Sequence, residues 1–302
     1  MFKSKNGMSR ALVRRETTAG YLFLLPSLFF FITFVLYPMF MCIYTSFFDS
    51  NMGKNAVDVF VGLGNYKELF QDKLFLGALK NTVVIVVVAV PTVCAFSLWV
   101  ATAIYDMKPA LTSAFRCIFY LPVVTGSVAV TVVWKWMYNS RYGVFNYLFK
   151  SLGIIDQNIN WLGDARFALW CIILILFTTS VGQPIVLYVS ALGNVDHSLV
   201  EAAQVDGANR RQVFWKIKWA QIMPTTLYIL IITTINSFQC FALIQLLTSG
   251  GPTHSTDTIM YYIYYTAFKL YRYGYGNAMG VVLMVTIAVL SAVQFKLGQR
   301  SD

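Results

Sequence analysis

The sequence predicts an all-α integral membrane protein with six transmembrane helices. Of its 302 residues, 58% are hydrophobic and only 12% are charged, whereas about a quarter of the residues in a soluble domain are charged. The mean hydropathy is +0.63. The apolar residues are collected in six long runs without Lys, Arg, Asp or Glu, and roughly 17–25 such residues let a helix cross a bilayer.

The six runs are interpreted, in chain order, as the six spans of one transmembrane domain over residues 20–297, with loop included in the longer runs. They are Thr17–Phe48, Asn81–Tyr105, Cys117–Trp134, Phe167–Val195, Trp219–Thr256 and Tyr273–Phe295. The first run follows a basic start but far exceeds the roughly 7–15 apolar residues of a secretory signal peptide. It is therefore expected to be a retained helix.

The distribution of basic residues predicts the orientation in the membrane. Lys and Arg gather in the N-terminal tail and at the ends of the apolar runs, which explains the net charge of +10 better than binding to nucleic acid does. Cytoplasmic segments are enriched in Lys and Arg, so the tail 1–19 is expected in the cytoplasm. Six crossings then place the loop of about 192–218 and the tail 298–302 there too, and the loops 49–80 and 138–166 outside.

A polar stretch of small residues separates the fourth run from the fifth. Ser198 and Glu201 are spaced as a capping box, so a short helix is expected to begin at Ser198. Ala202 and Ala203 favour a helix and have little bulk, which lets a partner surface approach closely. Gly207 is suited to end the helix, because glycine readily adopts the left-handed conformation of a C-terminal cap. An ordinary amphipathic loop helix fits these local signals equally well.

The order Glu201-Ala202-Ala203, then Gly207, then Ile217 resembles the EAA loop of permease subunits of ATP-binding-cassette importers. In that family the loop forms a coupling helix that sits in a cleft of a cytoplasmic ATPase. The residues implied to contact the ATPase are Glu201, Ala202, Ala203, Asp206, Gly207 and Arg210. For Arg210, anchoring by the positive-inside rule is the simpler role.

Two other segments resemble the carbohydrate uptake permeases of this family, which include maltose and glycerol-phosphate types. Residues 60–70 contain the Gly-Leu-x-Asn-Tyr pattern of an external helix, and residues 248–268 contain a Gly-Gly-Pro turn followed by an aromatic helix. Trp219-Ala220 departs from the Leu-Pro pair of the family, although the second family proline is present as Pro224. The resemblance implies the type I importer fold, called MetI-like, with both termini in the cytoplasm.

The resemblance also implies a complex in the cytoplasmic membrane of a bacterium or archaeon. Its expected members are a second related permease, two ATPase subunits that carry ATP and Mg, and an extracytoplasmic binding protein that delivers a sugar. This sequence has no G-x-x-x-x-G-K-[ST] loop and no hydrolase motif. Its five cysteines and two histidines show no metal-ligand spacing. The chain is therefore expected to be a non-catalytic subunit without a cofactor or metal of its own.

Neutral polar side chains within the spans are candidates for the substrate path: Gln183, Asn236, Ser237 and Gln239. Such groups are costly in lipid, so they are expected to face a protein interior or a watery cavity. Amides suit the hydroxyls of a sugar, but hydrogen bonds between helices explain them equally well. Asn236 and Gln239 are three residues apart, which predicts a shared helical face.

Rings also cluster at the expected outer boundary of the third run, as Trp134, Trp136, Tyr138 and Tyr142. Rings at such a boundary are more often interfacial anchors than platforms for sugar. The anchor interpretation is preferred here.

Alternatives to the importer remain open. A secondary carrier uses ionisable side chains within its spans, and the absence of Asp and Glu from all six runs argues against that class. A membrane scaffold could use the same polar stretch to recruit a cytoplasmic protein. Within the importer class, a glycerol-phosphate-like anion is the alternative to a sugar.

Overall fold

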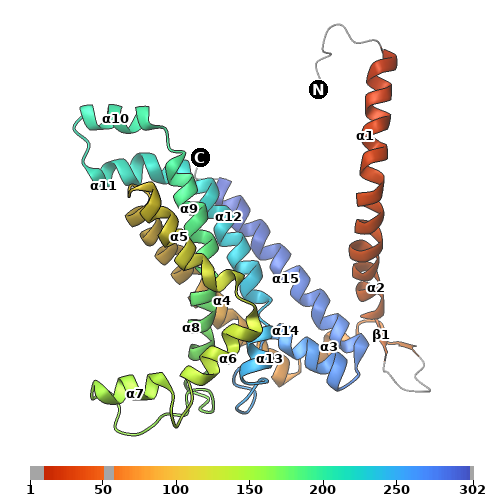
Figure 1. Cartoon of the computed structure of the whole chain (residues 1–302). Helices are drawn as coiled ribbons and strands as arrows, with labels where there is room; N and C mark the ends of the chain where they lie inside the picture. Colours follow the sequence, from red (N-terminus) through yellow and green to blue (C-terminus); the bar gives the residue numbers. More distant parts are fainter. Residues whose placement is uncertain (1–9, 51–57, 300–302) are drawn as a thin grey trace.

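The computed structural model describes residues 10–50 and 58–299, and these are almost entirely helical (Figure 1). The helices are α1 (Arg10–Phe31), α2 (Tyr37–Thr45), α3 (Gly64–Leu69), α4 (Lys73–Ile104), α5 (Pro109–Val124), α6 (Ser127–Met137), α7 (Val144–Ser151), α8 (Ala168–Ser180), α9 (Gly182–Gly193), α10 (His197–Val205), α11 (Arg210–Val213), α12 (Trp219–Phe238), α13 (Ala242–Leu247), α14 (Ile259–Tyr264) and α15 (Tyr273–Gln299). Short π-helical segments are η1 (Ile32–Leu36), η2 (Phe214–Lys218) and η3 (Tyr265–Lys269). Two short antiparallel strands, β1 (Phe48–Asp49) and β2 (Val59–Phe60), pair Phe48 with Phe60.

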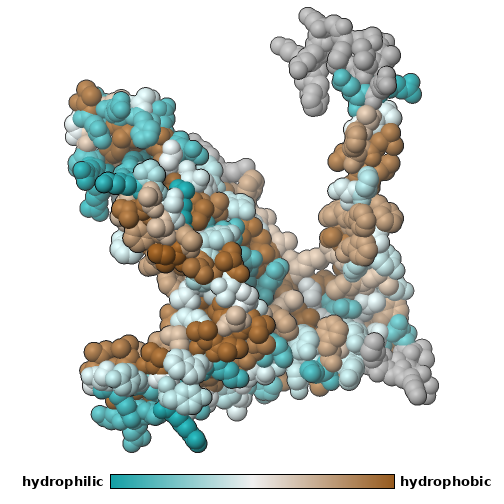
Figure 2. All heavy atoms as spheres, viewed as in Figure 1, coloured by the Kyte–Doolittle hydropathy of each residue, from teal (hydrophilic) through white to brown (hydrophobic). Residues whose placement is uncertain are grey.

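Five helical stretches are long and apolar enough to cross a membrane: Glu16–Thr45, Lys73–Ile104, Ala168–Gly193, Arg210–Leu247 and Tyr273–Gly298. A sixth crossing is obtained if α5 and α6 form one broken span, since they are bent by 94° to each other. Figure 2 shows apolar surface over the bundle and hydrophilic surface around α10 and at the opposite end. This distribution suits a chain that spans a bilayer.

The third predicted span requires a correction. The run Cys117–Trp134 is not one straight helix, because α5 ends at Val124 and α6 begins at Ser127. Thr125 and Gly126 between them have extended backbones with ψ angles of 127° and 141°. Glycine disfavours a helix interior, so the chain turns here although every residue of the run is uncharged.

Helix α4 forms the centre of the bundle, with α9 and α12 packed against it. Its buried face includes Val93, Ala101 and Ile104, which belong to the same apolar cluster as side chains of α9 and α12. Helix α5 crosses α9 at Gly182, where an added Cβ would lie 2.3 Å from the carbonyl oxygen of Phe119. The close crossing therefore requires glycine at this position.

Buried hydroxyl groups bond to the backbone at two interruptions of the spans. Between α8 and α9, the carbonyl of Val181 keeps a helical bond from the N–H of Ile185 at 3.1 Å and also accepts from the Oγ of Ser97 at 3.3 Å. Helix α12 stops at Phe238, and the Oγ1 of Thr258 donates to the carbonyl of Cys240 at 2.7 Å. An unsatisfied carbonyl at membrane depth would cost several kcal/mol, so the hydroxyl of Thr258 makes the end of α12 tolerable.

Helix α1 stands apart from the bundle (Figure 1). None of its most apolar 18-residue window is buried within the described chain. Helix α2 contacts α15 through Asn277, whose Nδ2 donates to the Oγ1 of Thr45 at 2.6 Å. The start of α1 and the end of α15 lie at the same end of the molecule as α10 (Figure 1). Residues 10–19 of the expected tail are helical, and residues 1–9 lie outside the described residues.

The opposite end is organised by the Gly-Leu-x-Asn-Tyr segment, which forms α3 as predicted. Asn65 is buried in this segment. Its Nδ2 donates to the carbonyls of Ser46 and Phe48, both at 2.9 Å. The segment therefore holds the chain that follows α2.

Asp72 joins three helices at this end. Its Oδ1 accepts from the backbone N–H of Leu74 at 2.8 Å and caps α4, while its Oδ2 accepts from the hydroxyls of Tyr262 and Tyr275 at 2.7 and 2.9 Å. Burial raises the pKa of Asp72, but the bonds from both tyrosines and from the backbone outweigh it and hold this pKa below its ordinary value. The ionised form is therefore the one that stabilises the junction.

We expect Asp72→Ala to lower the free energy of unfolding by about 1–3 kcal/mol, because the cap and a charged acceptor are both lost. Thermal unfolding in detergent measures this loss, and Asp72→Asn, which keeps a cap acceptor, is expected to lose less. A lowered folded pKa means that the wild-type advantage is present above the unfolded pKa, near ~4, and is lost as the pH falls through the folded pKa. Equal melting of wild type and Asp72→Ala at neutral pH would contradict this role.

Candidate functional site

Helix α10 projects from one end of the bundle (Figure 1). None of its described residues is buried. Leu199 and Val205 are 50% and 88% exposed, although both are apolar. Exposed apolar side chains on a projecting helix are typical of a surface that meets another molecule.

The start of α10 differs from the prediction. The helix begins at His197, and its cap is Asp196, whose Oδ1 accepts from the backbone N–H of Ser198 at 2.9 Å. The predicted cap at Ser198 is therefore wrong, because the carboxylate two residues earlier takes the amide at the helix start. Hydrogen bonds from the Ser198 side chain and backbone lower the pKa of Asp196. The backbone N–H of Asp196 also donates to the Oε1 of Gln221 at 3.0 Å, which ties α10 to α12.

The end of α10 confirms the expected role of Gly207. This residue has a φ of +82°. Its N–H donates to the carbonyl of Gln204 at 3.0 Å, and the N–H of Ala208 donates to the carbonyl of Ala203 at 2.9 Å. These two bonds form a Schellman motif, which needs a left-handed residue at this position.

A second cap follows at once and was missed by the sequence analysis. Asn209 and Gln212 form a reciprocal capping box at the start of α11, with side-chain to backbone distances of 2.9 and 2.8 Å. The signal was present, because Asn followed three residues later by Gln is a capping-box pattern. Two caps in succession make the turn between α10 and α11 a defined structure.

Contacts at the base of α11 connect this helix pair to the bundle. The Nζ of Lys218 donates to the hydroxyl of Tyr105 and lies 4.5 Å from the centre of the Tyr105 ring. Tyr105 directly follows α4. The helix pair α10–α11 is therefore attached to α4 through Lys218 and to α12 through Gln221.

The six residues implied to meet an ATPase are distributed around this helix pair. Ala203, Asp206 and Gly207 line a hollow of about 320 Å³. Arg210 lines a separate hollow of about 570 Å³, which it shares with Asp106 and Lys218. Glu201 and Ala202 are exposed and line neither hollow.

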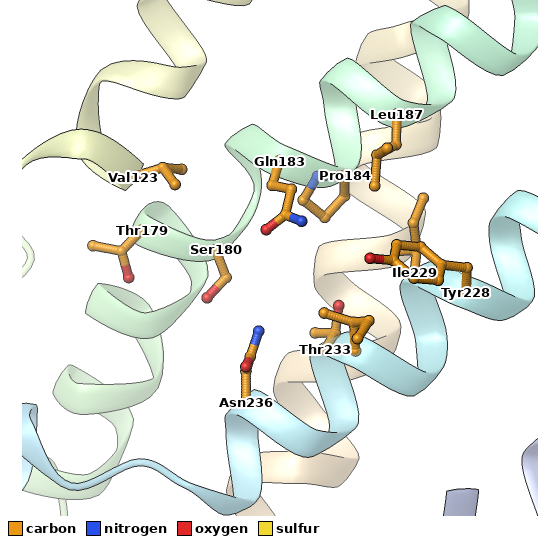
Figure 3. A pocket seen from close by; sticks show the side chains of 11 residues that line it. Val123, Thr179, Ser180, Gln183, Pro184, Leu187, Tyr228, Ile229, Thr233 and Asn236 are labelled. Carbon is orange, nitrogen blue, oxygen red and sulfur yellow. The ribbon is translucent and has the colours of Figure 1, made fainter. Parts of the chain in front are cut away.

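A polar cavity of about 150 Å³ lies between α5, α8, α9 and α12. The amides of Gln183 and Asn236 and the hydroxyl of Ser180 point into one space (Figure 3). The lining residues that carry polar groups are Thr179, Ser180, Gln183, Tyr228, Thr233 and Asn236. This cavity offers neutral hydrogen-bond donors and acceptors, and no charged side chain is among the described residues that line it.

Two of the four predicted path residues are thus brought together, from different helices. The other two do not line this cavity: Ser237 is 2% exposed within the bundle, and Gln239 follows the last residue of α12. The shared lining expected for Asn236 and Gln239 is not formed here, because the helix stops between them. Tyr228 and Asn236 are eight residues apart on α12, a spacing that could have revealed the lining face.

The cavity offers hydrogen bonds to a polar solute, and the described residues that line it include no Asp, Glu, His or Lys. Hydroxyls and amides exchange hydrogen bonds with a polyhydroxyl compound without changing protonation state. Among residues 10–50 and 58–299, no three His, Cys, Asp or Glu side chains gather as metal ligands.

Comparison with known proteins decides the family. Residues 21–301 match the family described as binding-protein-dependent transport system inner membrane component. The chain belongs to this family. One relative, the probable ABC transporter permease protein YesP of Bacillus subtilis (strain 168), is 33% identical over 94% of this chain and 91% of its own length. Another, the lactose transport system permease protein LacF of Rhizobium radiobacter, is 32% identical over 94% of this chain and 95% of its own.

Among solved structures, the fold is similar to a chain of the bacterial alginate ABC transporter in complex with an alginate pentasaccharide-bound periplasmic protein. The TM-score is 0.82 at 24% identity, covering 95% of this chain and 96% of that one. The permease therefore has the all-helical MetI-like fold. It is a multi-pass membrane permease of an ABC transporter, a class of non-catalytic transport subunits.

The C-terminal cap of α10 at Gly207 can be tested against a second glycine, Gly193, the last residue of α9. Gly207 and Gly193 both have open space where a Cβ would stand, but only Gly207 has a positive φ. We expect Gly207→Val to raise the hydrogen-exchange rate of the Ala208 amide roughly 5- to 30-fold. The reason is that valine in the left-handed conformation adds about 1–2 kcal/mol of backbone strain, which favours opening of the cap. Gly193→Val is expected to leave that amide unchanged, and equal exchange in both variants would contradict the strain argument.

Proposed function

We propose that this permease forms half of a translocation path for a neutral sugar or oligosaccharide and is driven by cytoplasmic ATPases through α10 and α11. The observation that carries the proposal is the exposed helix α10, which Asp196 ties to α12 and which is joined through α11 and η2 to the Lys218 contact with Tyr105 after α4. Helix α12 also carries Asn236 into the polar cavity. One helix therefore connects the coupling surface to the path.

Glu201, Ala202, Ala203, Asp206, Gly207 and Arg210 form the proposed coupling surface. Ala203 and Gly207 leave a hollow beside α10, so an ATPase surface can approach the backbone closely. ATP and Mg belong to the two ATPase subunits. When these close on ATP, α10 moves with them, and its attachments to α12 and α4 pass the movement to the spans.

A second, related permease is proposed to complete the path. The apolar window of α1 has no cover within the described chain, and such a helix is suited to pack on another membrane subunit or in lipid. We place the α10 end, with the start of α1 and the end of α15, in the cytoplasm of a bacterium or archaeon, following the positive-inside rule. An extracytoplasmic binding protein then delivers the solute at the α3 end.

The chemistry of the cavity favours a neutral sugar over the alternatives. A glycerol-phosphate-like anion would call for Lys or Arg, and the described residues that line the cavity include neither. A secondary carrier would call for Asp, Glu or His, and the described residues that line the cavity include none of these. Gln183 and Asn236 instead present amides, which can both donate hydrogen bonds to hydroxyls and accept hydrogen bonds from them.

Coupling is tested by Ala203→Trp, which fills the hollow beside α10. In the reconstituted complex, we expect the ATPase activity that loaded binding protein stimulates to fall roughly tenfold or more. A tenfold fall corresponds to a loss of about 1.4 kcal/mol in the binding free energy between α10 and the ATPase. Ala165→Trp is the matched control, because Ala165 is exposed in the loop before α8, at the other end of the molecule. Wild-type stimulation in Ala203→Trp would refute the docking role.

The path is tested by Gln183→Ala and Asn236→Ala. Each change removes one amide that a sugar hydroxyl can bind, so the half-saturation concentration for uptake is expected to rise roughly two- to tenfold. Gln239→Ala is the control, since Gln239 does not line the cavity. If uptake is unchanged in both cavity variants while the complex assembles normally, this cavity is not part of the path.

A further inference from the structure

A second cavity, of about 190 Å³, lies at the end of the molecule opposite α10, between α7 and α8. Its walls include the rings of Phe145, Phe149 and Trp161 and the side chains of Trp170 and Leu174. It shares no lining residue with the polar cavity. We call it the aromatic groove.

Two polar groups at the aromatic groove, on Tyr138 and Trp161, are already used within the protein. The hydroxyl of Tyr138 donates to the carbonyl of Cys171 at 3.3 Å. The Nε1 of Trp161 donates to the Oδ1 of Asn146 at 3.0 Å. A sugar needs hydrogen bonds that these groups no longer offer, so the groove is suited to an apolar ligand.

The aromatic groove continues onto the outer face of a membrane span. Trp170 and Leu174 are four residues apart on α8, within the span Ala168–Gly193, and are 55% and 41% exposed. Side chains at this spacing lie on one face of a helix. A hydrocarbon chain beside this face can therefore enter the groove without crossing water.

Helix α7 covers the aromatic groove as a rigid element. Asn146 is buried in α7, where its Nδ2 donates to the carbonyl of Ile159 at 2.9 Å and its Oδ1 accepts from the N–H of Ile159 at 3.1 Å. These bonds fix α7 to the segment that carries Trp161, so the rings are held in place before any ligand arrives.

The exposed surface of α7 suits a membrane interface. Tyr147 and Leu148 are 76% and 47% exposed, and Leu152 just beyond the helix is 63% exposed. Lys150 is exposed beside Phe149, a wall of the groove. In Figure 2 the surface over α7 is apolar on the side toward the α10 end and hydrophilic on the opposite side. An amphipathic helix with this pattern lies in the plane of the interface.

We propose that the aromatic groove binds one acyl chain of an anionic phospholipid, whose phosphate lies near Lys150. The apolar walls take the hydrocarbon, the rings mark the depth of the headgroup region, and the lysine meets the negative charge. The lipid would hold α7 against the outer end of α8, the helix whose last residue, Ser180, lines the polar cavity. This assignment does not depend on which solute is transported.

The test uses the full transport complex reconstituted in phosphatidylglycerol vesicles. A fraction of this lipid carries a photoactivatable diazirine near the end of one acyl chain, and mass spectrometry locates the attached lipid after illumination. We expect labelling to concentrate on the peptides that contain Phe149, Trp161 and Trp170. Labelling spread evenly over the exposed apolar faces, or absent from these peptides, would overturn the proposal.

Paired variants test whether the chain lies inside the groove. Leu174→Trp fills the groove and is expected to lower labelling of the groove peptides at least about fourfold. A fourfold loss is what excluding roughly one methylene group from an apolar site would cause. Val87→Trp is the control, because Val87 is 63% exposed on α4 and is not a groove residue. Co-purification with the ATPases confirms assembly, and Leu174→Ala, which keeps the groove open, is expected to retain labelling.

Two results would assign the groove to another occupant and so refute the lipid. Suppression of labelling by transported sugar would make the rings a sugar platform. Chemical cross-links from Lys150 to another subunit, together with unlabelled groove peptides, would show that a protein covers the surface.

Discussion

Every backbone N–H and C=O at membrane depth must find a partner inside the protein, and the shape of this permease follows from how it meets that requirement. Continuous helices satisfy it automatically. Beyond the end of α12, the carbonyl of Cys240 is paired by the buried hydroxyl of Thr258. At Val181 the carbonyl keeps its helical bond from Ile185, and the hydroxyl of Ser97 adds a second donor. Ser97 and Thr258 lie outside the helices that they bond, so both contacts exist only in the packed bundle.

The packing of helices decides where polar side chains gather. Ser180 and Gln183 are three residues apart, a spacing that places side chains on one helical face, and both face the same space (Figure 3). Asn236 reaches that space from the last turn of α12, just before the chain leaves the helix. The polar cavity therefore forms where this face of α8 and α9 meets α12.

The two ends of the molecule show different chemistry. At the α10 end, short helices are closed by caps at Asp196, Gly207 and Asn209 and present an unburied surface. At the other end, Asp72 gathers hydroxyls of two tyrosines, and rings surround the groove under α7. Capped helices keep their shape in water, whereas rings suit the boundary between water and lipid. The two ends are thus fitted to meet different kinds of molecule.

Much of this structure could be predicted from the sequence, because it depends on the chemistry of neighbouring residues. Long uncharged runs predicted the spans, and Gly207 was recognisable as a helix end because the left-handed conformation favours glycine. Amides within spans were expected to face a protein interior or a watery cavity. The bend in Cys117–Trp134 has a local cause at Gly126, which the uncharged run concealed. The stop of α12 before Gln239 was decided by tertiary structure, since the hydroxyl of Thr258 pairs the carbonyl of Cys240 there. Burial of Ser237 and exposure of Asn236 follow from the same packing. The sequence by itself thus determined which residues belong in the membrane and which helix projects from it. The bundle decided which polar residues share a cavity, because only long-range contacts set which helix faces meet.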